Sequence, residues 1–206
     1  MQRDAKTHRQ GPTIALSVPE INGKEWEYVK ECLDTGWVSS AGDFVDRFEN
    51  AVATFVGAKH AIAVTNGTSA LHTALLLAGI GPDEEVLVPS LTFIAPANAI
   101  RYVGAWPIFI DVDQETWQID PQRIAEFVDK ECQWQNGRLR NLATGRTVRA
   151  ILPIHLLGHP ADMTPLLQLA HKYELKVIED AAESIGAQYR GQAVGRLGHI
   201  GCFSFN

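Results

Sequence analysis

Apolar and polar positions recur with helical spacing near the amino terminus. Trp26, Val29 and Leu33 follow one another every three or four residues, as on the apolar face of an amphipathic helix. Asn22 and Glu25 have the spacing of a capping box at its start. We therefore predict a helix that begins at about Asn22.

A second helical pattern follows the loop "TGWVSSAG". It runs from Phe44 to Phe55, and Gly57 is placed to terminate it. Residues 1–20 show no clear periodicity. We expect them to form an extended arm in front of a single domain made of residues 21–206.

Beyond residue 59 the pattern changes to short apolar runs separated by helical segments. The predicted strands are 60–65, 85–90, 106–112, 149–155, 176–181 and 199–206. The predicted helices are 68–79, 95–104, one with Asp120 as N-cap and Pro121 at its first position, and one that opens at Pro165. Continuous apolar strands alternating with helices predict an α/β fold with a mostly parallel sheet covered on both faces.

Composition narrows the class of protein. The 206 residues are 46% hydrophobic and 20% charged, with a formal net charge of −6. This balance argues against a nucleic-acid or membrane binder, which needs a basic surface. Arg138, Arg140, Arg146 and Arg149 form the densest basic group, and we interpret them as solvated residues of a polar connection.

Cysteine usage and the amino terminus indicate the compartment. Cys32, Cys132 and Cys202 are far apart, and no C-x-x-C spacing indicates a metal site. We expect three packed, reduced thiols. The first residues, "MQRDAKTHRQGPT", lack the apolar segment of a secretory signal, and no apolar run could span a bilayer. We therefore expect a soluble, cytoplasmic protein.

Three strand ends carry residues that suggest chemistry. In "VTNGTSAL", Gly67 permits a tight turn, and Thr68 and Ser69 then open a helix whose amides and hydroxyls could hold a phosphate. An ordinary capped turn is the alternative. Phe93 follows another strand and could lie against a planar ring, although core packing is the commoner role of a single Phe. Asp180 ends a buried strand, where it could pair with a cation or cap a helix.

The three features together favour one cofactor. A phosphate cradle, an aromatic shelf and a carboxylate at successive strand ends are what pyridoxal 5′-phosphate requires. The carboxylate would keep the pyridine nitrogen protonated, so that the ring can accept electrons.

Longer stretches of the sequence resemble a known family. "NGTSAL", "VLVPSLTFIAPANAIRYVGAWPIFIDVD", "HLLGHPADM", "IEDAAESIGA" and "GCFSFN" occur in the order found in the DegT/DnrJ/StrS-type aminotransferases of nucleotide-sugar biosynthesis. The resemblance implies the large domain of fold-type-I pyridoxal-phosphate enzymes. It also implies transamination of a nucleotide-linked keto-deoxysugar, glutamate as amino donor, and a homodimer.

The resemblance also assigns roles to single residues. It makes Gly67, Thr68, Ser69 and Ser204 phosphate or turn contacts, Phe93 the stacking aromatic and Asp180 the partner of the ring nitrogen. Glu183 occupies a position where many relatives carry His or Gln near the ring. His155 and His159 lie in the family's strand-end loop, and we interpret both as core or turn residues.

The Schiff-base lysine of the family is expected about four residues after "FSF", beyond Asn206. Lys176 begins the strand that Asp180 ends and should lie at the wrong side of the sheet. We therefore expect a truncated large domain without the small carboxyl-terminal domain. Two alternatives stay open: a sugar dehydratase on the same scaffold, with histidine in place of the lysine, and a non-catalytic fragment.

We predict that the 206-residue chain alone has no transaminase activity and tends to aggregate. The reason is that a later antiparallel strand of the family fold would separate the strands at 60–65 and 199–206, and without it both strands have open edges. Turnover and solution size, compared with a version extended beyond Asn206, test this. Equal activity of the two proteins would contradict it.

Overall fold

The structure is a computed structural model that describes residue 15 and residues 18–205. Most of the predicted arm at residues 1–20 therefore lies outside the described part. The chain divides into two compact units, Met1–Val45 and Asp46–Asn206, and each is considered by itself.

The first unit contains α1 (Glu25–Thr35), which confirms the first predicted helix. The predicted capping box is wrong. The helix begins at Glu25, so Lys24 takes the N-cap position; the Glu25 carboxylate accepts the Gly23 N–H at 2.9 Å, and the Asn22 amide donates to Glu20 at 2.8 Å. A capping box needs the acidic residue at the third helical position, but Glu25 occupies the first position and Asn22 lies before the N-cap.

The second unit holds the sheet and its helices. The helix α2 (Asp43–Val56) leads into it, as predicted, and ends at Gly57 with φ +72°. The remaining elements are α3 (Gly67–Leu77), β1 (Glu84–Pro89), α4 (Ile94–Tyr102), β2 (Trp106–Ile110), α5 (Pro121–Glu131), β3 (Cys132–Gln135), β4 (Arg138–Asn141), β5 (Thr147–Ile151), the 3-10 turn η1 (Leu156–Gly158), α6 (Met163–Lys172), β6 (Lys176–Asp180), β7 (Gln188–Tyr189), β8 (Gln192–Ala193) and β9 (Ile200–Cys202).

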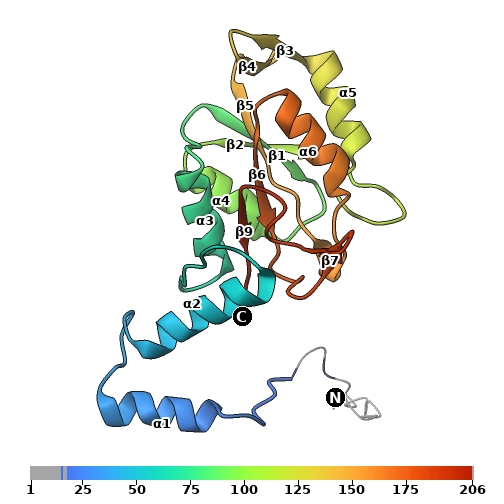
Figure 1. Cartoon of the computed structure of the whole chain (residues 1–206). Helices are drawn as coiled ribbons and strands as arrows, with labels where there is room; N and C mark the ends of the chain where they lie inside the picture. Colours follow the sequence, from blue (N-terminus) through green and yellow to red (C-terminus); the bar gives the residue numbers. More distant parts are fainter. Residues whose placement is uncertain (1–14, 16–17, 206) are drawn as a thin grey trace, which may run out of the picture. The chain divides into compact units, whose positions relative to one another are not determined.

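Five parallel strands form the body of the sheet, in the order β2-β1-β5-β6-β9 (Figure 1). The strand β4 pairs antiparallel with the first residues of β5 and carries β3 on its other side. The predicted α/β class with a mostly parallel sheet is therefore confirmed.

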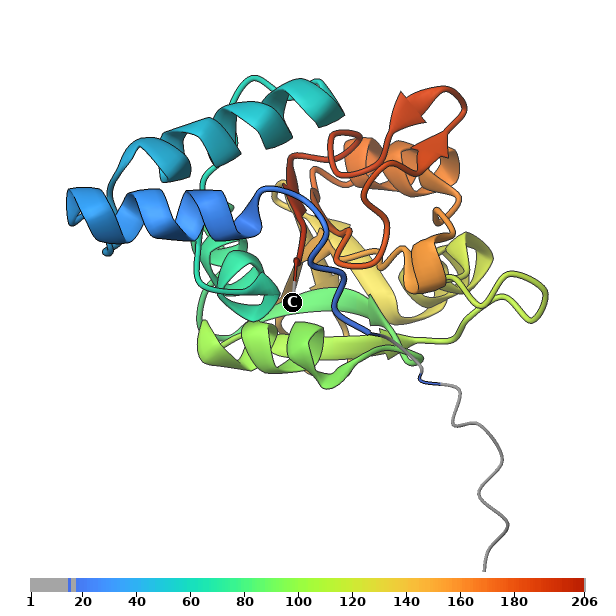
Figure 2. The same cartoon turned by 90° about the horizontal axis from the view of Figure 1, so that it is seen from below.

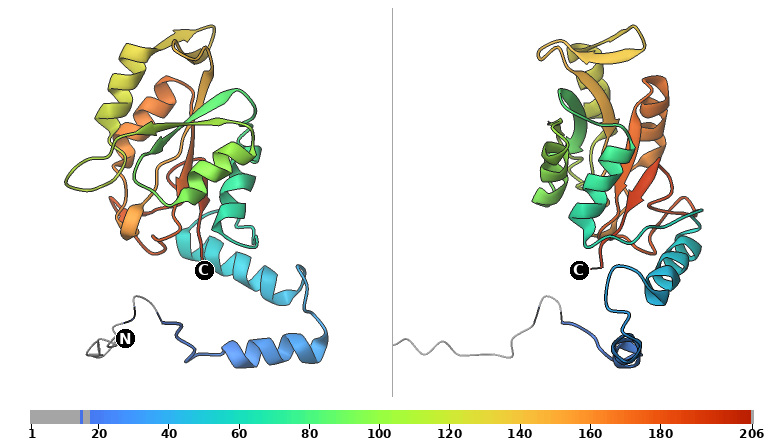
Figure 3. Two further views of the ribbon diagram at one scale, coloured as in Figure 1. Left: turned by 180° about the vertical axis from the view of Figure 1, so that it is seen from behind. Right: turned by 90° about the vertical axis from the view of Figure 1, so that its left-hand side faces the viewer.

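Helices cover both faces of this sheet (Figures 2 and 3). Val86, Val88 and Ile178 pack with α3 and α4, whereas Leu87 and Val177 pack with α5 and α6. Neighbouring residues of one strand thus enter opposite cores, because successive side chains of a strand point to opposite faces. Among the described residues, no helix has the length and apolarity needed to cross a bilayer.

The predicted strand at 60–65 is wrong. Residues 61–64 form no ladder, and Ile62 and Val64 are exposed. A strand requires a hydrogen-bonding neighbour, and no strand in the described part of the chain pairs with this segment. The Glu49 carboxylate instead accepts the Ala63 N–H at 2.7 Å.

The hairpin β3–β4 was not anticipated. Its turn consists of Asn136 and Gly137, both with positive φ (53° and 69°). Asn-Gly is the preferred pair for a two-residue hairpin, so the signal was present in the sequence. The hairpin carries Arg138 and Arg140 on β4, where both side chains are exposed. The interpretation of these two residues as solvated is therefore confirmed, whereas the polar connection that holds them is a hairpin.

The other two arginines of this group are only partly exposed and have defined partners. The Arg149 guanidinium lies 3.1 Å from the Glu84 carboxylate, and that of Arg146 lies 4.4 Å from the centre of the Trp106 ring. Arg101 contacts the same ring at 3.9 Å. Arg101, Arg146 and Arg149, which are charged residues, therefore help to cover the edge of the sheet at which the parallel strands begin.

The three cysteines are free thiols, as predicted. Burial raises the pKa of Cys132 and of Cys202 to about 12. Both therefore remain protonated at neutral pH, and neither is an activated nucleophile.

We predict that Asp120→Ala lowers the free energy of unfolding by about 1 kcal/mol. The Asp120 carboxylate accepts the Gln122 N–H at 2.8 Å and Pro121 follows it, which confirms the predicted start of α5. Urea unfolding of purified protein measures the change. Asp120→Asn is the matched control, because its amide oxygen can cap equally well; an equal loss in both variants would contradict the capping explanation.

Candidate functional site

The predicted site residues gather at one edge of the sheet, where the parallel strands end. Phe93 follows β1, Asp180 is the last residue of β6, and Ser204 follows β9 by two residues. Parallel neighbours end at the same edge, which is where ligands bind in open α/β sheets. The amino-terminal end of α3 lies at this edge as well (Figure 1), and its first residue, Gly67, is next to Ser204.

The first turn of α3 forms the proposed phosphate cradle. Asn66 is its N-cap, and its side-chain oxygen accepts the Ser69 N–H at 2.8 Å. The Ser69 amide is therefore already used, a contact that the sequence prediction missed. The amides of Gly67 and Thr68 have no partner within a helix that starts at Gly67, and they are the donors that an anion would meet.

Ser204 lies directly against this turn. A Cβ atom placed on Gly67 would be 2.9 Å from the Ser204 Cβ and 3.2 Å from its Oγ. The absence of a side chain at Gly67 is therefore what allows the two segments, 137 positions apart, to meet. The structure brings these two predicted phosphate contacts together.

Asp180 is held rigidly at the end of β6. Its side chain is 7% exposed, its N–H donates to the Pro153 carbonyl at 2.9 Å, and its carbonyl accepts the His155 N–H at 3.0 Å. One carboxylate oxygen accepts the Ala182 N–H at 3.1 Å.

The electrostatic surroundings of Asp180 favour a cationic partner. Burial raises the pKa of this carboxyl group, and the nearby Glu183 carboxylate raises it further, whereas the Ala182 N–H and His155 lower it. An ionised Asp180 is therefore poorly compensated by the protein, and a cation beside it would lower the pKa.

Glu179, the neighbour of Asp180, is fully buried on the opposite face of β6. Its carboxylate lies 3.0 Å from His155 Nε2, and His155 Nδ1 accepts the Ala161 N–H at 3.1 Å. His155 is thus a satisfied core residue, as expected, and the exposed His159 belongs to the turn that follows.

Glu183 contacts the turn η1. Its carboxylate accepts the Leu157 N–H at 2.7 Å, while Leu157 has a positive φ of 55° and an exposed side chain. From the other side, the buried Gln118 exchanges two hydrogen bonds with the backbone of Leu156, at 3.1 and 3.2 Å. Sequence reasoning assigned no role to Gln118, because the contact joins residues 38 positions apart.

Phe93 is the N-cap residue of α4 and is 77% exposed. The alternative that it is a core residue is therefore wrong. It is separated from Asp180 by β5, so two strand spacings, about 10 Å, lie between the ends of β1 and β6. The two residues therefore follow different strands at the same edge of the sheet.

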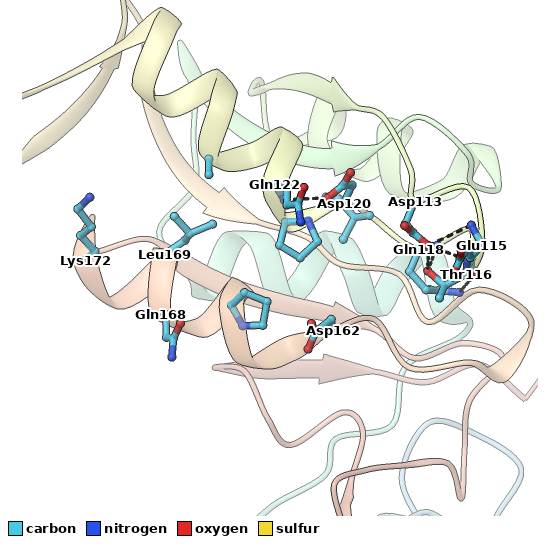
Figure 4. Close-up of a pocket in the computed structure, with 14 residues that line it drawn as sticks. Asp113, Glu115, Thr116, Gln118, Asp120, Gln122, Asp162, Gln168, Leu169 and Lys172 are labelled. Atoms are coloured by element: carbon cyan, nitrogen blue, oxygen red, sulfur yellow. Dashed lines mark hydrogen bonds between the residues drawn. The ribbon is translucent and has the colours of Figure 1, made fainter.

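A cavity of about 640 Å³ lies elsewhere (Figure 4). It is bounded by the loop before α5, the start of α5 and the helix α6, and its walls include Asp113, Gln118, Asp162 and Lys172. None of the predicted site residues lines it. Gln118, which lines it, also binds the backbone of Leu156.

Comparison with known proteins identifies the family. The model of the DegT/DnrJ/EryC1/StrS aminotransferase family matches residues 19–206. This chain belongs to that family. The aminotransferases of the family use pyridoxal 5′-phosphate.

Individual relatives agree with this placement. The chain is 47% identical over 194 residues to GDP-perosamine synthase of Caulobacter vibrioides, covering 94% of this chain and 48% of the relative. It is 45% identical over 157 residues to the UDP-N-acetyl-3-dehydro-α-D-glucosamine 3-aminotransferase of Acidithiobacillus ferrooxidans, covering 76% and 38%. The aminotransferase structure from Psychrobacter cryohalolentis superposes with a TM-score of 0.77 at 36% identity, covering 91% and 44%. The chain thus spans about half the length of the curated relatives it matches, or less.

The geometry fits the cofactor of this family. The close approach of Gly67 and Ser204 places a hydroxyl beside the first turn of α3, whose first amides have no helical partner, and Asp180 supplies a buried carboxylate without a full set of donors. A phosphate and a protonated pyridine nitrogen are the groups that such partners bind.

We predict that Asp180→Asn increases the free energy of unfolding at pH 7 in the absence of cofactor. The raised pKa means that the folded state holds the Asp180 proton more tightly than the unfolded chain. The associated stability is complete below the ordinary value near 3.8 and is lost as pH rises through the folded pKa. An amide avoids this loss and can still accept the Ala182 N–H.

Urea unfolding of the wild type and the variant, at pH 7 and near pH 3, measures the effect. The advantage of the variant should shrink toward zero at the lower pH. Asp129→Asn, at an exposed position of α5, is the control that should show no such trend. A variant that is less stable than the wild type at pH 7 would refute the explanation.

Proposed function

We propose that this chain forms the pyridoxal-phosphate-binding large domain of a cytoplasmic, homodimeric sugar aminotransferase. The enzyme transfers an amino group, with glutamate as donor, to the keto carbon of a nucleotide-linked deoxysugar used for surface polysaccharides. Two relatives support this substrate class by name, because GDP-perosamine is a nucleotide-linked amino sugar and the 3-dehydro substrate of the other is a nucleotide-linked keto sugar.

The observation that carries the proposal is the contact between Gly67 and Ser204 at the start of α3. The Gly67 and Thr68 amides and the Ser204 hydroxyl donate to the cofactor phosphate, and the helix dipole adds to the attraction. The Ser69 hydroxyl, 3.1 Å from that of Thr65, completes the cradle.

Asp180 binds the protonated ring nitrogen. When bound, the cofactor would carry the amino group from the donor to the keto carbon, and its ring would accept the electron pair that is set free in between. Asp180 keeps a proton on that nitrogen, because a buried carboxylate with one backbone donor gains most from a cationic partner.

Phe93 and Glu183 complete the surroundings of the ring. The exposed Phe93 side chain offers a flat apolar surface at the same edge of the sheet. Glu183 fixes the Leu157 turn after β5, between the strand ends that carry Phe93 and Asp180. Glu183 therefore affects the surroundings of the ring indirectly, by holding this turn in place.

The proton-transferring lysine of this chemistry is not Lys176. Lys176 and Asp180 are the first and last residues of β6, so about 13 Å of extended chain separates them. Lys176 therefore lies at the opposite edge from the proposed cofactor.

We predict that the purified chain binds pyridoxamine 5′-phosphate reversibly. This form of the cofactor carries an amine and forms no imine with surface lysines, so it reports the non-covalent site alone. Asp180→Asn should weaken binding about 10- to 100-fold, the value of a hydrogen bond between charged groups, and Ser204→Ala about 5-fold. Fluorescence titration of the ligand measures the dissociation constants.

Asp129→Asn is the matched carboxylate control and should bind like the wild type. Lack of saturable binding by the wild type, or unchanged binding by Asp180→Asn, would overturn the proposed function.

A further inference from the structure

The carboxylate of Glu179 has four hydrogen-bond partners in a fully buried position. Oε1 accepts the N–H groups of Leu197 and Gly198, at 2.7 and 2.6 Å. Oε2 accepts the Gly195 N–H at 2.8 Å and lies 3.0 Å from His155 Nε2. Three of the four partners belong to the turn 195–198, which precedes β9.

The fourth partner has a defined hydrogen position. His155 Nδ1 accepts the Ala161 N–H, so the ring proton is on Nε2 and is donated to Glu179. His155 also donates its backbone N–H to the Asp180 carbonyl. Glu179 therefore connects the segment after β5 with the turn before β9, from the face of β6 opposite to Asp180.

The turn 195–198 packs closely against the strands β6 and β9. A Cβ on Gly201 would lie 2.0 Å from the Gly195 carbonyl oxygen, and one on Gly198 would lie 2.8 Å from the Val177 carbonyl oxygen. A Cβ on Gly195 would lie 2.3 Å from the ring of Phe203. A shift of this turn would therefore displace Gly201 and Phe203, which precede Ser204 in the chain.

We infer that Glu179 is a positioning residue for the phosphate cradle. It fixes the turn 195–198, the turn fixes Phe203, and Phe203 places the Ser204 hydroxyl against Gly67. The inference rests on the proposed function, because the cradle matters only if a phosphate binds there. Asp180 binds the ring nitrogen of the cofactor, whereas its neighbour Glu179 positions the Ser204 hydroxyl that binds the phosphate.

Glutamine at position 179 breaks this arrangement in either orientation of its amide. Each carboxylate oxygen accepts two donors, so the NH₂ group of Glu179→Gln must face two N–H groups. His155→Gln is the matched control, because it changes only the fourth partner and leaves all three turn amides on Glu179.

The test compares pyridoxamine 5′-phosphate with pyridoxamine, which lacks the phosphate. The dissociation constant of pyridoxamine divided by that of pyridoxamine 5′-phosphate measures the phosphate contribution alone, and this ratio falls when that contribution is lost. We expect Glu179→Gln to reduce this ratio about tenfold, as for the loss of one hydrogen bond to a charged group. Ser204→Ala should also reduce it, whereas Asp180→Asn should weaken both ligands and leave the ratio unchanged. A general loss of structure would weaken both ligands alike.

A second readout is independent of ligand. Amide hydrogen exchange at Gly195, Leu197 and Gly198 should become at least about tenfold faster in Glu179→Gln, while Ile124 of the remote helix α5 keeps its rate. Where Glu179→Gln does not fold, Glu179→Asp replaces it. Its carboxylate is shorter by one methylene and cannot reach the turn and His155 together, so the ratio should again fall.

The outcomes separate the two proposals. If the wild type binds the phosphorylated ligand but the variants at Glu179 keep the wild-type ratio, the positioning role is overturned and the proposed function stands. If His155→Gln reduces the ratio as much as Glu179→Gln, Glu179 does not act on Ser204 through the turn 195–198, and the positioning role is also overturned. If the wild type does not bind the phosphorylated ligand, the proposed function and this inference both fall.

Discussion

The parallel pairing of β6 with β9 is the constraint on which the candidate site depends. It places Asp180 opposite Cys202, and the chain then needs only two more residues to bring Ser204 against the first turn of α3. The pairing is secured from behind by the Glu179 carboxylate and by glycines that let the turn 195–198 approach both strands. A slip of one residue in this register would exchange the faces of Glu179 and Asp180.

Adjacent carboxylates therefore have unlike environments. Glu179 accepts hydrogen bonds from four donors, whereas Asp180 accepts one and has a pKa that burial raises. Because side chains alternate along a strand, Glu179 binds the protein's own backbone on one face while Asp180 remains available to a ligand on the other. At η1, likewise, Gln118 and Glu183 form hydrogen bonds with the backbone, and the Leu157 side chain is exposed.

The site is built on strand ends and one helix start, while the cavity beside α5 and α6 lies apart from it. The fold therefore offers open functional groups at the sheet edge. The aminotransferases of this family use pyridoxal 5′-phosphate, and the proposed site places its contacts at this edge. The exposed Phe93 is one of these groups, since its side chain lies outside the core.

The sequence by itself determined the α/β class, the buried strands β1 and β6, the caps at Asp120 and Gly57, and the residues around which a cofactor site was expected. These are local or periodic properties, because burial of alternate faces and capping chemistry depend on neighbours in the chain. Tertiary structure alone decided the contacts between distant segments: Gly67 with Ser204, Gln118 with Leu156, and Glu179 with the turn 195–198. It also decided that 61–64 is no strand, since a ladder requires a partner strand and apolar composition cannot supply one.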